Sequence, residues 1–252
     1  MSEQEKSLCN SMEQELKKLL LGYGIESTEL QRKQLLKHLE LLIEINKTLN
    51  LTRITSIDDA LVLHILDSLL PLRTCKEFTS NEKNYIDIGT GGGFPGLPLA
   101  IMSANKSLLI DSIGKKITAV QKMIEEIGLS KRVEALKLRA EEIPTEYKGK
   151  FNFVTFRAVA KTNILLEYAE PFLAPQGTLI VMKANVDKIE LQDASQAAKI
   201  FGYKNVSRET FELPNDLGHR EILLYKKVEK SKIKLPRKTG QAKLNPFVAR
   251  RS

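Results

Sequence analysis

From Asn84 onward, short apolar runs alternate with longer amphipathic stretches, and this alternation constrains the fold more than any other feature of the sequence. The apolar runs are typical of buried parallel strands, and they span 85–88, 108–110, 133–138, 151–156 and 178–182. Helical spacing occurs between them, over 97–104, 115–127, 162–173 and 188–201. The pattern predicts an α/β fold with a doubly wound, Rossmann-like sheet. Two later runs, 206–213 and 221–228, have no helix between them and predict an antiparallel edge, which makes seven strands.

The segment 1–75 predicts helices instead. Its apolar residues share helical faces, namely Leu16, Leu19, Leu20 and Tyr23 in one run and Leu35, Leu36, Leu39, Leu42 and Ile43 in the next. A third helical run, 58–70, is expected to stop at Pro71. We therefore expect an N-terminal helical segment at 1–75 packed on the core, a main domain at 84–228 and a basic tail at 229–252.

The net charge of +8 is concentrated at the C-terminus. The segment 226–252 holds ten Lys and Arg but one acid, Glu229, whereas the segment 1–225 is almost neutral. A cationic arm suits a polyanion, because each phosphate contacted releases counterions. The alternative is a solvated terminus without a partner. If the tail contacts RNA phosphates, its removal should weaken RNA binding and leave cofactor binding intact.

Composition excludes several classes of protein. No apolar run approaches the ~20 residues that span a bilayer, and the polar N-terminus is no secretory signal. Cys9 and Cys75 lie far apart and indicate plain thiols in a reducing cytoplasm. The three histidines, His38, His64 and His219, are equally scattered, so we expect no metal site and no membrane partner.

The stretch "DIGTGGGFPG", residues 87–96, follows the first expected strand and precedes a helix, as a nucleotide-binding turn does. A dinucleotide fingerprint, G-x-G-x-x-G, would need a third glycine where Phe94 stands. The bulky ring argues against a pyrophosphate and favours a nucleoside with little or no phosphate. S-adenosylmethionine is such a ligand, and Gly89, Gly91 and Gly93 are its candidate contacts.

Two acidic positions agree with a nucleoside. Asp111 ends the second expected strand, where a carboxylate can accept hydrogen bonds from ribose hydroxyls. Glu141, in "LRAEEI", follows the third strand and lies where side chains can bracket the adenine. Asp111 could instead cap the helix near Lys115, and Glu141 with Glu142 could be a solvated pair at a helix start.

Cations follow the fourth and fifth strands. Arg157 and Lys161 occur in "FRAVAKT", and Lys183 ends the fifth strand. Cations at this edge favour a substrate that carries phosphates, although Arg157 could instead pair with a neighbouring carboxylate. The chain has no Asn/Asp-Pro-Pro-Tyr/Phe stretch for amino-group methylation and no Pro-Cys dipeptide for C5-pyrimidine chemistry. The catalytic residues stay unknown at this point.

Together these motifs resemble those of the bacterial small-subunit ribosomal RNA methyltransferase G family, also called glucose-inhibited division protein B, over nearly the whole chain. The matching segments are "NLTRI", "HILDSL", "DIGTGGGFPGLPLAI", "LIDSIGKK", "LRAEE", "FRAVA" and "LPRKTGQAKLNP". The resemblance implies a class I methyltransferase sheet and S-adenosylmethionine-dependent methylation of guanine N7 in 16S ribosomal RNA. It places cofactor contacts at Gly89, Phe94, Ala140, Glu141 and Arg157.

The implied chemistry suits a chain without an obvious general base. Guanine N7 presents a lone pair in the ring plane, so catalysis needs mainly alignment of the reacting groups. Because N7 is out of reach in duplex RNA, the target base must lie in a loop or be swung out. Phe94 and Phe247 are candidate stacking platforms, with apolar packing as the alternative. The expected partner is 16S ribosomal RNA or the small ribosomal subunit, and the expected state is a cytoplasmic monomer.

Two other functions are compatible with parts of the pattern. The acceptor could be a protein or a small molecule, against which the basic tail and the edge cations argue. The chain could also be an RNA-binding or ribosome-associated module without activity, against which the intact glycine loop and Asp111 argue.

Overall fold

The computed structural model describes residues 3–54 and 56–250, with side chains from residue 10 onward. Seven strands form one sheet in the order β3-β2-β1-β4-β5-β7-β6. The strands are β1 Asn84–Ile88, β2 Lys106–Asp111, β3 Val133–Lys137, β4 Phe151–Arg157, β5 Leu173–Lys183, β6 Tyr203–Glu212 and β7 His219–Lys227. The neighbouring pairs β3–β2, β2–β1, β1–β4 and β4–β5 are parallel, and β7 pairs antiparallel with both β5 and β6. The predicted seven-stranded sheet with its antiparallel edge is confirmed.

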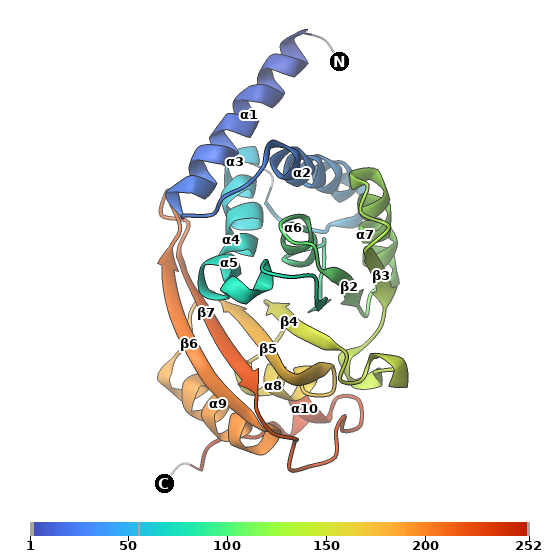
Figure 1. Cartoon of the computed structure of the whole chain (residues 1–252), viewed down its shortest axis with the longest axis vertical. Coiled ribbons are helices and arrows are strands. Elements are labelled where there is room, and N and C mark those ends of the chain that lie inside the picture. The colour runs from blue at the N-terminus through green and yellow to red at the C-terminus, as the bar shows by residue number, and fades with distance from the viewer. Residues whose placement is uncertain (1–2, 55, 251–252) are drawn as a thin grey trace.

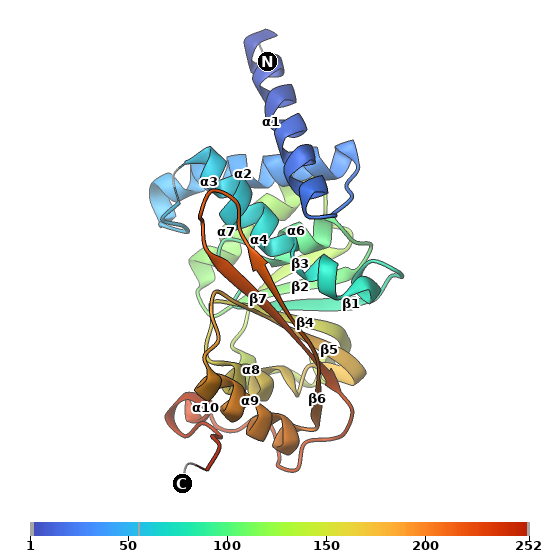
Figure 2. The same ribbon diagram turned by 90° about the vertical axis from the view of Figure 1, so that its left-hand side faces the viewer.

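Helices cover both faces of the sheet (Figures 1 and 2). One face carries α1 Glu3–Gly22, α2 Glu29–Leu49, α3 Ile57–Ala60, α4 Asp67–Leu69, α5 Pro71–Thr74, α6 Gly96–Ile101 and α7 Gly114–Ile127. The other carries α8 Thr162–Ala169, α9 Lys188–Phe201 and α10 Gln241–Leu244. A π-helical turn, Leu61–Leu66, joins α3 to α4, and 3₁₀ turns occupy Lys76–Phe78, Ala140–Glu142 and Thr145–Tyr147.

Alternation along the strands produces two hydrophobic cores, since successive side chains of a strand point to opposite faces. Tyr85 packs into the core beneath the N-terminal helices, while its neighbours Ile86 and Ile88 pack into the core beneath α8 and α9. Phe153 and Val154 divide in the same way. The N-terminal helices therefore share a core with the sheet. The division into three domains stays a prediction.

One boundary predicted from the sequence is confirmed and another is wrong. The helical run before Pro71 ends as expected, since α4 ends at Leu69, and Pro71 begins the separate short helix α5, because the first turn of a helix leaves N–H groups without intrahelical partners and proline lacks this group. Leu173 was expected at the end of a helix, but α8 ends at Ala169 and Leu173 begins β5, where it pairs with Phe151. In this case sheet pairing overrides local spacing.

The C-terminal tail follows the sheet onto the face covered by α8 and α9 (Figure 2). Its apolar side chains Ile233, Leu235 and Phe247 pack against the core of that face, and Ala242 is buried. Over the described residues 229–250, the tail is therefore packed on the body of the protein, in contrast to the alternative of a solvated appendage.

Candidate functional site

The glycine loop lies where β1 ends, beside the end of β2. The backbone N–H groups of Gly89 and Thr90 both donate to the carbonyl oxygen of Ile110, at 2.8 and 3.0 Å. Asp111 holds the loop from the same side, because its Oδ2 accepts from the Gly91 N–H at 3.1 Å. Its Oδ1 accepts from the Ile113 N–H at 2.9 Å, although no side chain caps α7. Asp111 thus connects the first two strand ends and is not the cap of α7.

The three candidate glycines differ in the space beside them. A Cβ on Gly89 would lie 2.6 Å from the Val159 side chain, and one on Gly93 would lie 2.9 Å from Leu97 and 3.0 Å from His38. A Cβ on Gly91 would meet no atom closer than the Gly89 carbonyl oxygen, at 4.0 Å. Gly89 and Gly93 permit close packing within the protein, whereas Gly91 leaves open space that a ligand can occupy.

A pocket of about 280 Å³ opens beside the loop at the carboxyl ends of β1 to β4. This is the position where open α/β sheets bind their ligands, because the strand order reverses there. Four of the candidate residues line it, namely Gly89, Asp111, Ala140 and Glu141. The pocket also contains side chains that were not among the candidates from the sequence, including Lys116, Tyr168 and Lys243. Lys243 comes from the C-terminal tail, far along the chain from the glycine loop, so no local pattern could have indicated it.

Glu141 is held in place and is not a solvated residue. Its Oε1 accepts from the backbone N–H of Gly240 at 2.6 Å, and Tyr168 lies beside it among the residues that line the pocket. Burial and the Glu141 charge raise the pKa of Tyr168 to about 12, so the phenol keeps its proton near neutral pH. Glu142, by contrast, is exposed. The alternative of a solvated pair therefore describes Glu142 but not Glu141.

Phe94 lies outside the pocket and is buried between two histidines. Its ring stacks on His38 at 4.2 Å and on His64 at 4.5 Å between centroids. Both faces of the ring are covered, so Phe94 has the apolar packing role and leaves no platform for a nucleobase. Phe247 also packs internally, edge-on against Phe201 at 5.4 Å. No local pattern indicated that two distant histidines would meet at one ring.

The two histidines attach the N-terminal helices to the glycine loop. His38 Nε2 donates to the Gly92 carbonyl oxygen at 3.0 Å, and His64 Nε2 lies 2.9 Å from the Thr52 hydroxyl. Burial lowers the pKa of His38 to about 4 and that of His64 to about 3. Both rings are therefore neutral near pH 7, as stacking in an apolar setting requires.

Arg157 bridges the end of β4 to the N-terminal helices. Its Nη1 donates to Asp67 Oδ2 at 3.0 Å and to the Leu63 carbonyl oxygen at 3.1 Å, and its guanidinium lies 5.4 Å from the Phe94 ring centre. Arg220 donates to the other oxygen of Asp67 at 3.1 Å. The carboxylate pairing considered for Arg157 is therefore present. Its two bonds use Nη1, and among the described residues Nε and Nη2 have no hydrogen-bond acceptor.

Lys161 and Lys183 differ in their surroundings. Lys183 Nζ lies 2.8 Å from Glu190 Oε1 and donates to the Ala160 carbonyl oxygen at 3.1 Å. The same Glu190 oxygen accepts from the Thr162 N–H at 2.8 Å, so Lys183 helps to hold the loop after β4. Lys161 is exposed just before α8 and has no ion pair within the described chain.

Asp87, which was not among the candidates from the sequence, links the glycine loop to β4 through hydrogen bonds. Its Oδ2 accepts from the Gly96 N–H at 3.0 Å, and its Oδ1 accepts from the Thr155 hydroxyl at 2.7 Å. Burial raises the pKa of Asp87 to about 6, although the bonds from Thr155 and Gly96 oppose this. A charged residue in an apolar strand was the available signal, since buried carboxylates need partners.

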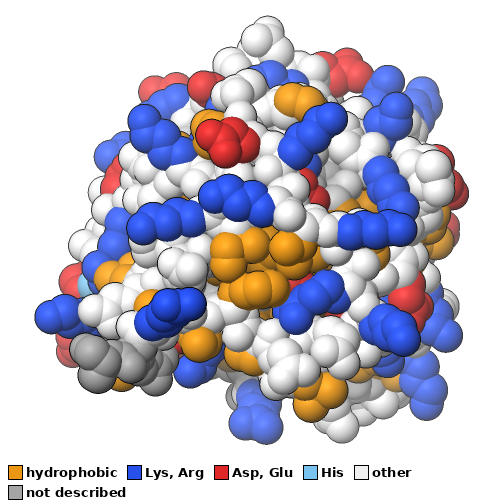
Figure 3. Space-filling model, turned by 90° about the horizontal axis from the view of Figure 1, so that it is seen from below, with side chains coloured by type: hydrophobic (Ala, Val, Ile, Leu, Met, Phe, Trp, Pro, Cys, Tyr) orange, Lys and Arg blue, Asp and Glu red, His pale blue; other side chains and the backbone are white. Residues whose placement is uncertain are grey.

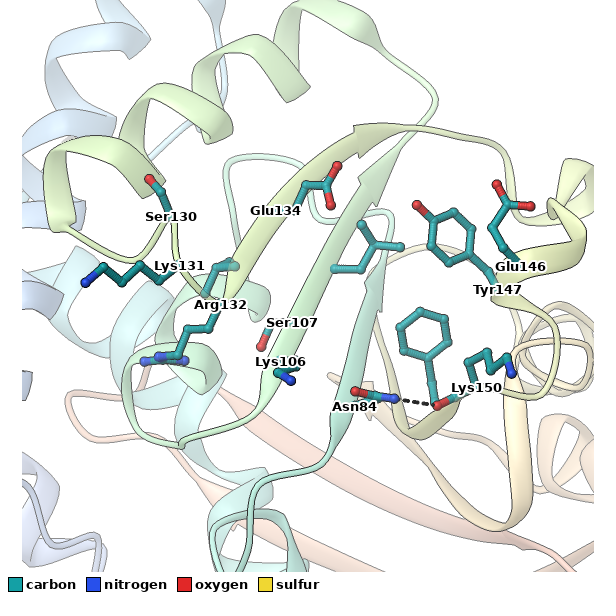
Figure 4. Close-up of a pocket in the computed structure, with 13 residues that line it drawn as sticks. Asn84, Lys106, Ser107, Ser130, Lys131, Arg132, Glu134, Glu146, Tyr147 and Lys150 are labelled. Atoms are coloured by element: carbon teal, nitrogen blue, oxygen red, sulfur yellow. Dashed lines mark hydrogen bonds between the residues drawn. The ribbon is translucent and has the colours of Figure 1, made fainter.

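A larger hollow, about 440 Å³, lies at the opposite edge of the sheet. Figure 4 shows Lys131, Arg132 and Lys150 around it together with Glu134 and Glu146. This edge holds the amino ends of the strands, away from the glycine loop, and its charges are mixed. We therefore do not assign it to the cofactor.

Neither a metal site nor a membrane-spanning helix is found in the part of the chain that the structure describes. No group of three His, Cys, Asp or Glu side chains there could hold a metal ion. Cys75 is a buried free thiol whose pKa burial raises to about 11, while the Cys9 side chain lies outside the described residues. None of the described helices combines the length and the apolar content that crossing a membrane requires.

Comparison with known proteins identifies relatives over most of the chain. The family model described as "rRNA small subunit methyltransferase G" matches residues 31–220. A protein of that name from Lactococcus lactis is 37% identical over 231 residues, which is 90% of this chain and 96% of the relative. Another from Alkaliphilus oremlandii is 37% identical over 236 residues, 92% of this chain and 97% of the relative.

Solved structures share the fold at low identity. A putative sarcosine dimethylglycine methyltransferase from Galdieria sulphuraria superposes with a TM-score of 0.53 at 13% identity, over 69% of this chain and 89% of that one. A Burkholderia thailandensis 1,6-didemethyltoxoflavin-N1-methyltransferase gives a TM-score of 0.51 at 13% identity, over 65% and 77%. This chain therefore shares its fold with these two structures.

Proposed function

Because the chain belongs to the rRNA small subunit methyltransferase G family, we propose that it methylates N7 of a guanine in 16S ribosomal RNA at the pocket beside the glycine loop. The protein is an S-adenosylmethionine-dependent rRNA methyltransferase. The finer proposal, a guanine N7 within the small subunit, rests on the same family. One observation carries the location of the site, namely the open space beside Gly91, which does not line the pocket itself but donates its N–H to Asp111, a residue that does.

The residues present match the needs of S-adenosylmethionine, which when bound supplies a methyl group activated by a sulfonium. Gly91 leaves room at the loop, and Asp111 and Glu141 provide carboxylate acceptors for a nucleoside's hydroxyl and amino groups. We assign cofactor contacts to Gly89, Gly91, Gly93, Phe94, Asp111, Ala140, Glu141 and Arg157. For Gly93 and Phe94, which face the protein's interior, the contact is through the loop backbone.

The acceptor atom explains why the site holds no free general base. Guanine N7 carries an available lone pair, so no proton has to be removed before methyl transfer. The two pocket carboxylates already accept hydrogen bonds from backbone N–H groups, Asp111 from Gly91 and Glu141 from Gly240. The task left to the protein is to hold the acceptor base in line and to exclude water, a proximity effect.

The cations after β4 and β5 are proposed to face RNA. Lys161 is exposed and without an ion pair among the described residues, so it can contact a phosphate directly. Lys183 is held by Glu190 and Arg157 by Asp67, so both are fixed in orientation beside the loop after β4. Phosphate contacts of this kind set register and carry little sequence information.

We further propose that the protein acts as a monomer in the cytoplasm on the small ribosomal subunit. The test is methyl transfer from labelled S-adenosylmethionine to small subunits isolated from a strain that lacks this gene. Nucleosides from the product are then separated and identified by mass spectrometry. The proposal expects 7-methylguanosine in 16S RNA and a loss of signal for Gly91→Val, and labelled protein or a different methylated nucleoside would contradict it.

A further inference from the structure

The C-terminal residues 235–247, here called the C-terminal clasp, are fastened to α8 by one buried ion pair. Arg237 donates through Nε to Glu167 Oε1 at 2.7 Å and through Nη2 to Oε2 at 2.6 Å. Glu167 is almost fully buried, so the pair is shielded from water. Arg237 also covers the Phe247 ring at 4.7 Å and donates to the Asn245 carbonyl oxygen at 3.0 Å. Such a two-bond pair fixes position as well as charge.

From this anchor the clasp reaches the cofactor pocket. Gly240 donates its backbone N–H to Glu141 Oε1 at 2.6 Å, and Lys243 lies among the pocket residues. Ala242, between them, is buried on α8, which keeps this part of the clasp against the body. Figure 3 views the molecule from this C-terminal side, where Lys and Arg side chains surround an apolar patch.

We propose that the C-terminal clasp is part of the cofactor site, with Lys243 as a further binding residue and Arg237 and Gly240 as positioning residues that act through Glu141. This inference rests on the proposed function, because it takes the pocket to be the place of S-adenosylmethionine. Lys243 would donate from the rim to acceptor atoms of the bound nucleoside. Arg237 does not line the pocket and influences the ligand only by seating Gly240 on Glu141.

The physical reason is the freedom of a glutamate side chain. A carboxylate on three rotatable bonds loses rotamer entropy when it binds a ligand. Glu141 loses that freedom in advance, because its carboxylate already accepts a hydrogen bond from the Gly240 N–H. Preorganised contacts of this kind increase affinity by reducing the cost of ordering on binding. Releasing the clasp should therefore weaken cofactor binding, in contrast to the expectation from the sequence that removing the tail would leave it intact.

Calorimetric binding of S-adenosylhomocysteine to the full chain tests the proposal. Arg237→Gln and Lys234→Ala each remove one positive charge from the tail, but Lys234 lies outside the clasp, is exposed, and its side chain has no partner among the described residues. We expect Arg237→Gln to raise the Kd by about tenfold, the effect of one charge-assisted hydrogen bond. Lys243→Ala should raise it by about threefold to tenfold, and Lys234→Ala should leave it unchanged. Thermal melting of each variant reports whether the core stays folded.

A double-mutant cycle separates positioning from general stability. If Arg237 acts through Glu141, the Glu141→Ala/Arg237→Gln variant should bind no more weakly than Glu141→Ala alone. Additive losses in this cycle would overturn the positioning role. Parent-like affinity in both Arg237→Gln and Lys243→Ala would overturn the whole inference while leaving the proposed function standing. A parent that binds neither S-adenosylhomocysteine nor S-adenosylmethionine would overturn both.

Discussion

The sharpest prediction concerns Gly91, because its missing side chain is proposed to be the cofactor's space. Gly91 has φ +60°, so Gly91→Ala places an L-residue in the left-handed region, at a cost of about 1–2 kcal/mol of stability. The new Cβ meets no protein atom within contact distance, so packing adds nothing to that cost. The methyl would instead fill ligand space. If overpacking there costs about 1–3 kcal/mol, cofactor affinity falls roughly 5- to 150-fold.

Gly128 provides the matched control. It ends α7 with φ +80°, and a Cβ there would also meet no atom within 4 Å, yet it lies away from the pocket. Gly128→Ala should therefore lose the same stability as Gly91→Ala and keep its affinity for S-adenosylhomocysteine. Gly93→Ala should lose more stability than either, because its Cβ would lie 2.9 Å from Leu97.

The assay pairs urea denaturation with calorimetry on the same preparations. Equal stability losses with a loss of binding only in Gly91→Ala would support the assignment. If folded Gly91→Ala binds S-adenosylhomocysteine as tightly as the parent does, the open space beside the loop is not where the ligand lies, and the reasoning is refuted. A similar loss of binding in Gly128→Ala would mean that stability, not occlusion, controls affinity.

Three other predictions follow. The free energy of unfolding should fall as pH decreases from about 6.5 toward 4. The reason is that His38 and His64 have lower pKa values in the folded state, about 4 and 3, than in the unfolded state, so the unfolded state binds more protons in this pH range. Asp87 has the opposite effect, because its raised pKa of about 6 lets the folded state bind a proton as pH falls from 6 to 4. Asp87→Asn should therefore lose free energy of unfolding more steeply with falling pH in urea titrations. An equal loss in both proteins would contradict the raised pKa of Asp87. Lys183→Ala should lower methyl transfer more than cofactor affinity, and unchanged turnover would remove Lys183 from the site. Arg157→Ala should lower both methyl transfer and cofactor affinity, because it also removes one of the two arginines that pair with Asp67. Cofactor binding equal to that of the parent would refute this prediction.

Much of the fold followed from local patterns. The alternation of short apolar runs with amphipathic stretches predicted the sheet, because strand and helix periodicities are written in neighbouring residues. The glycine loop and Asp111 were found in the same way, since each motif occupies a fixed place after a strand, and both lie at the carboxyl ends of the strands. The position that failed, Leu173, lies at an element boundary, where pairing with a partner strand competes with local spacing.

What the sequence alone determined about this protein was therefore its fold class, its family and the strand ends around which the candidate site is built. Only the tertiary structure decided which distant residues meet there. It placed His38 and His64 on the two faces of Phe94, Asp67 on Arg157, and Gly240 on Glu141. Contacts of this kind join segments that lie far apart in the chain. They depend on the packing of whole elements, which leaves no periodic trace in the neighbouring sequence.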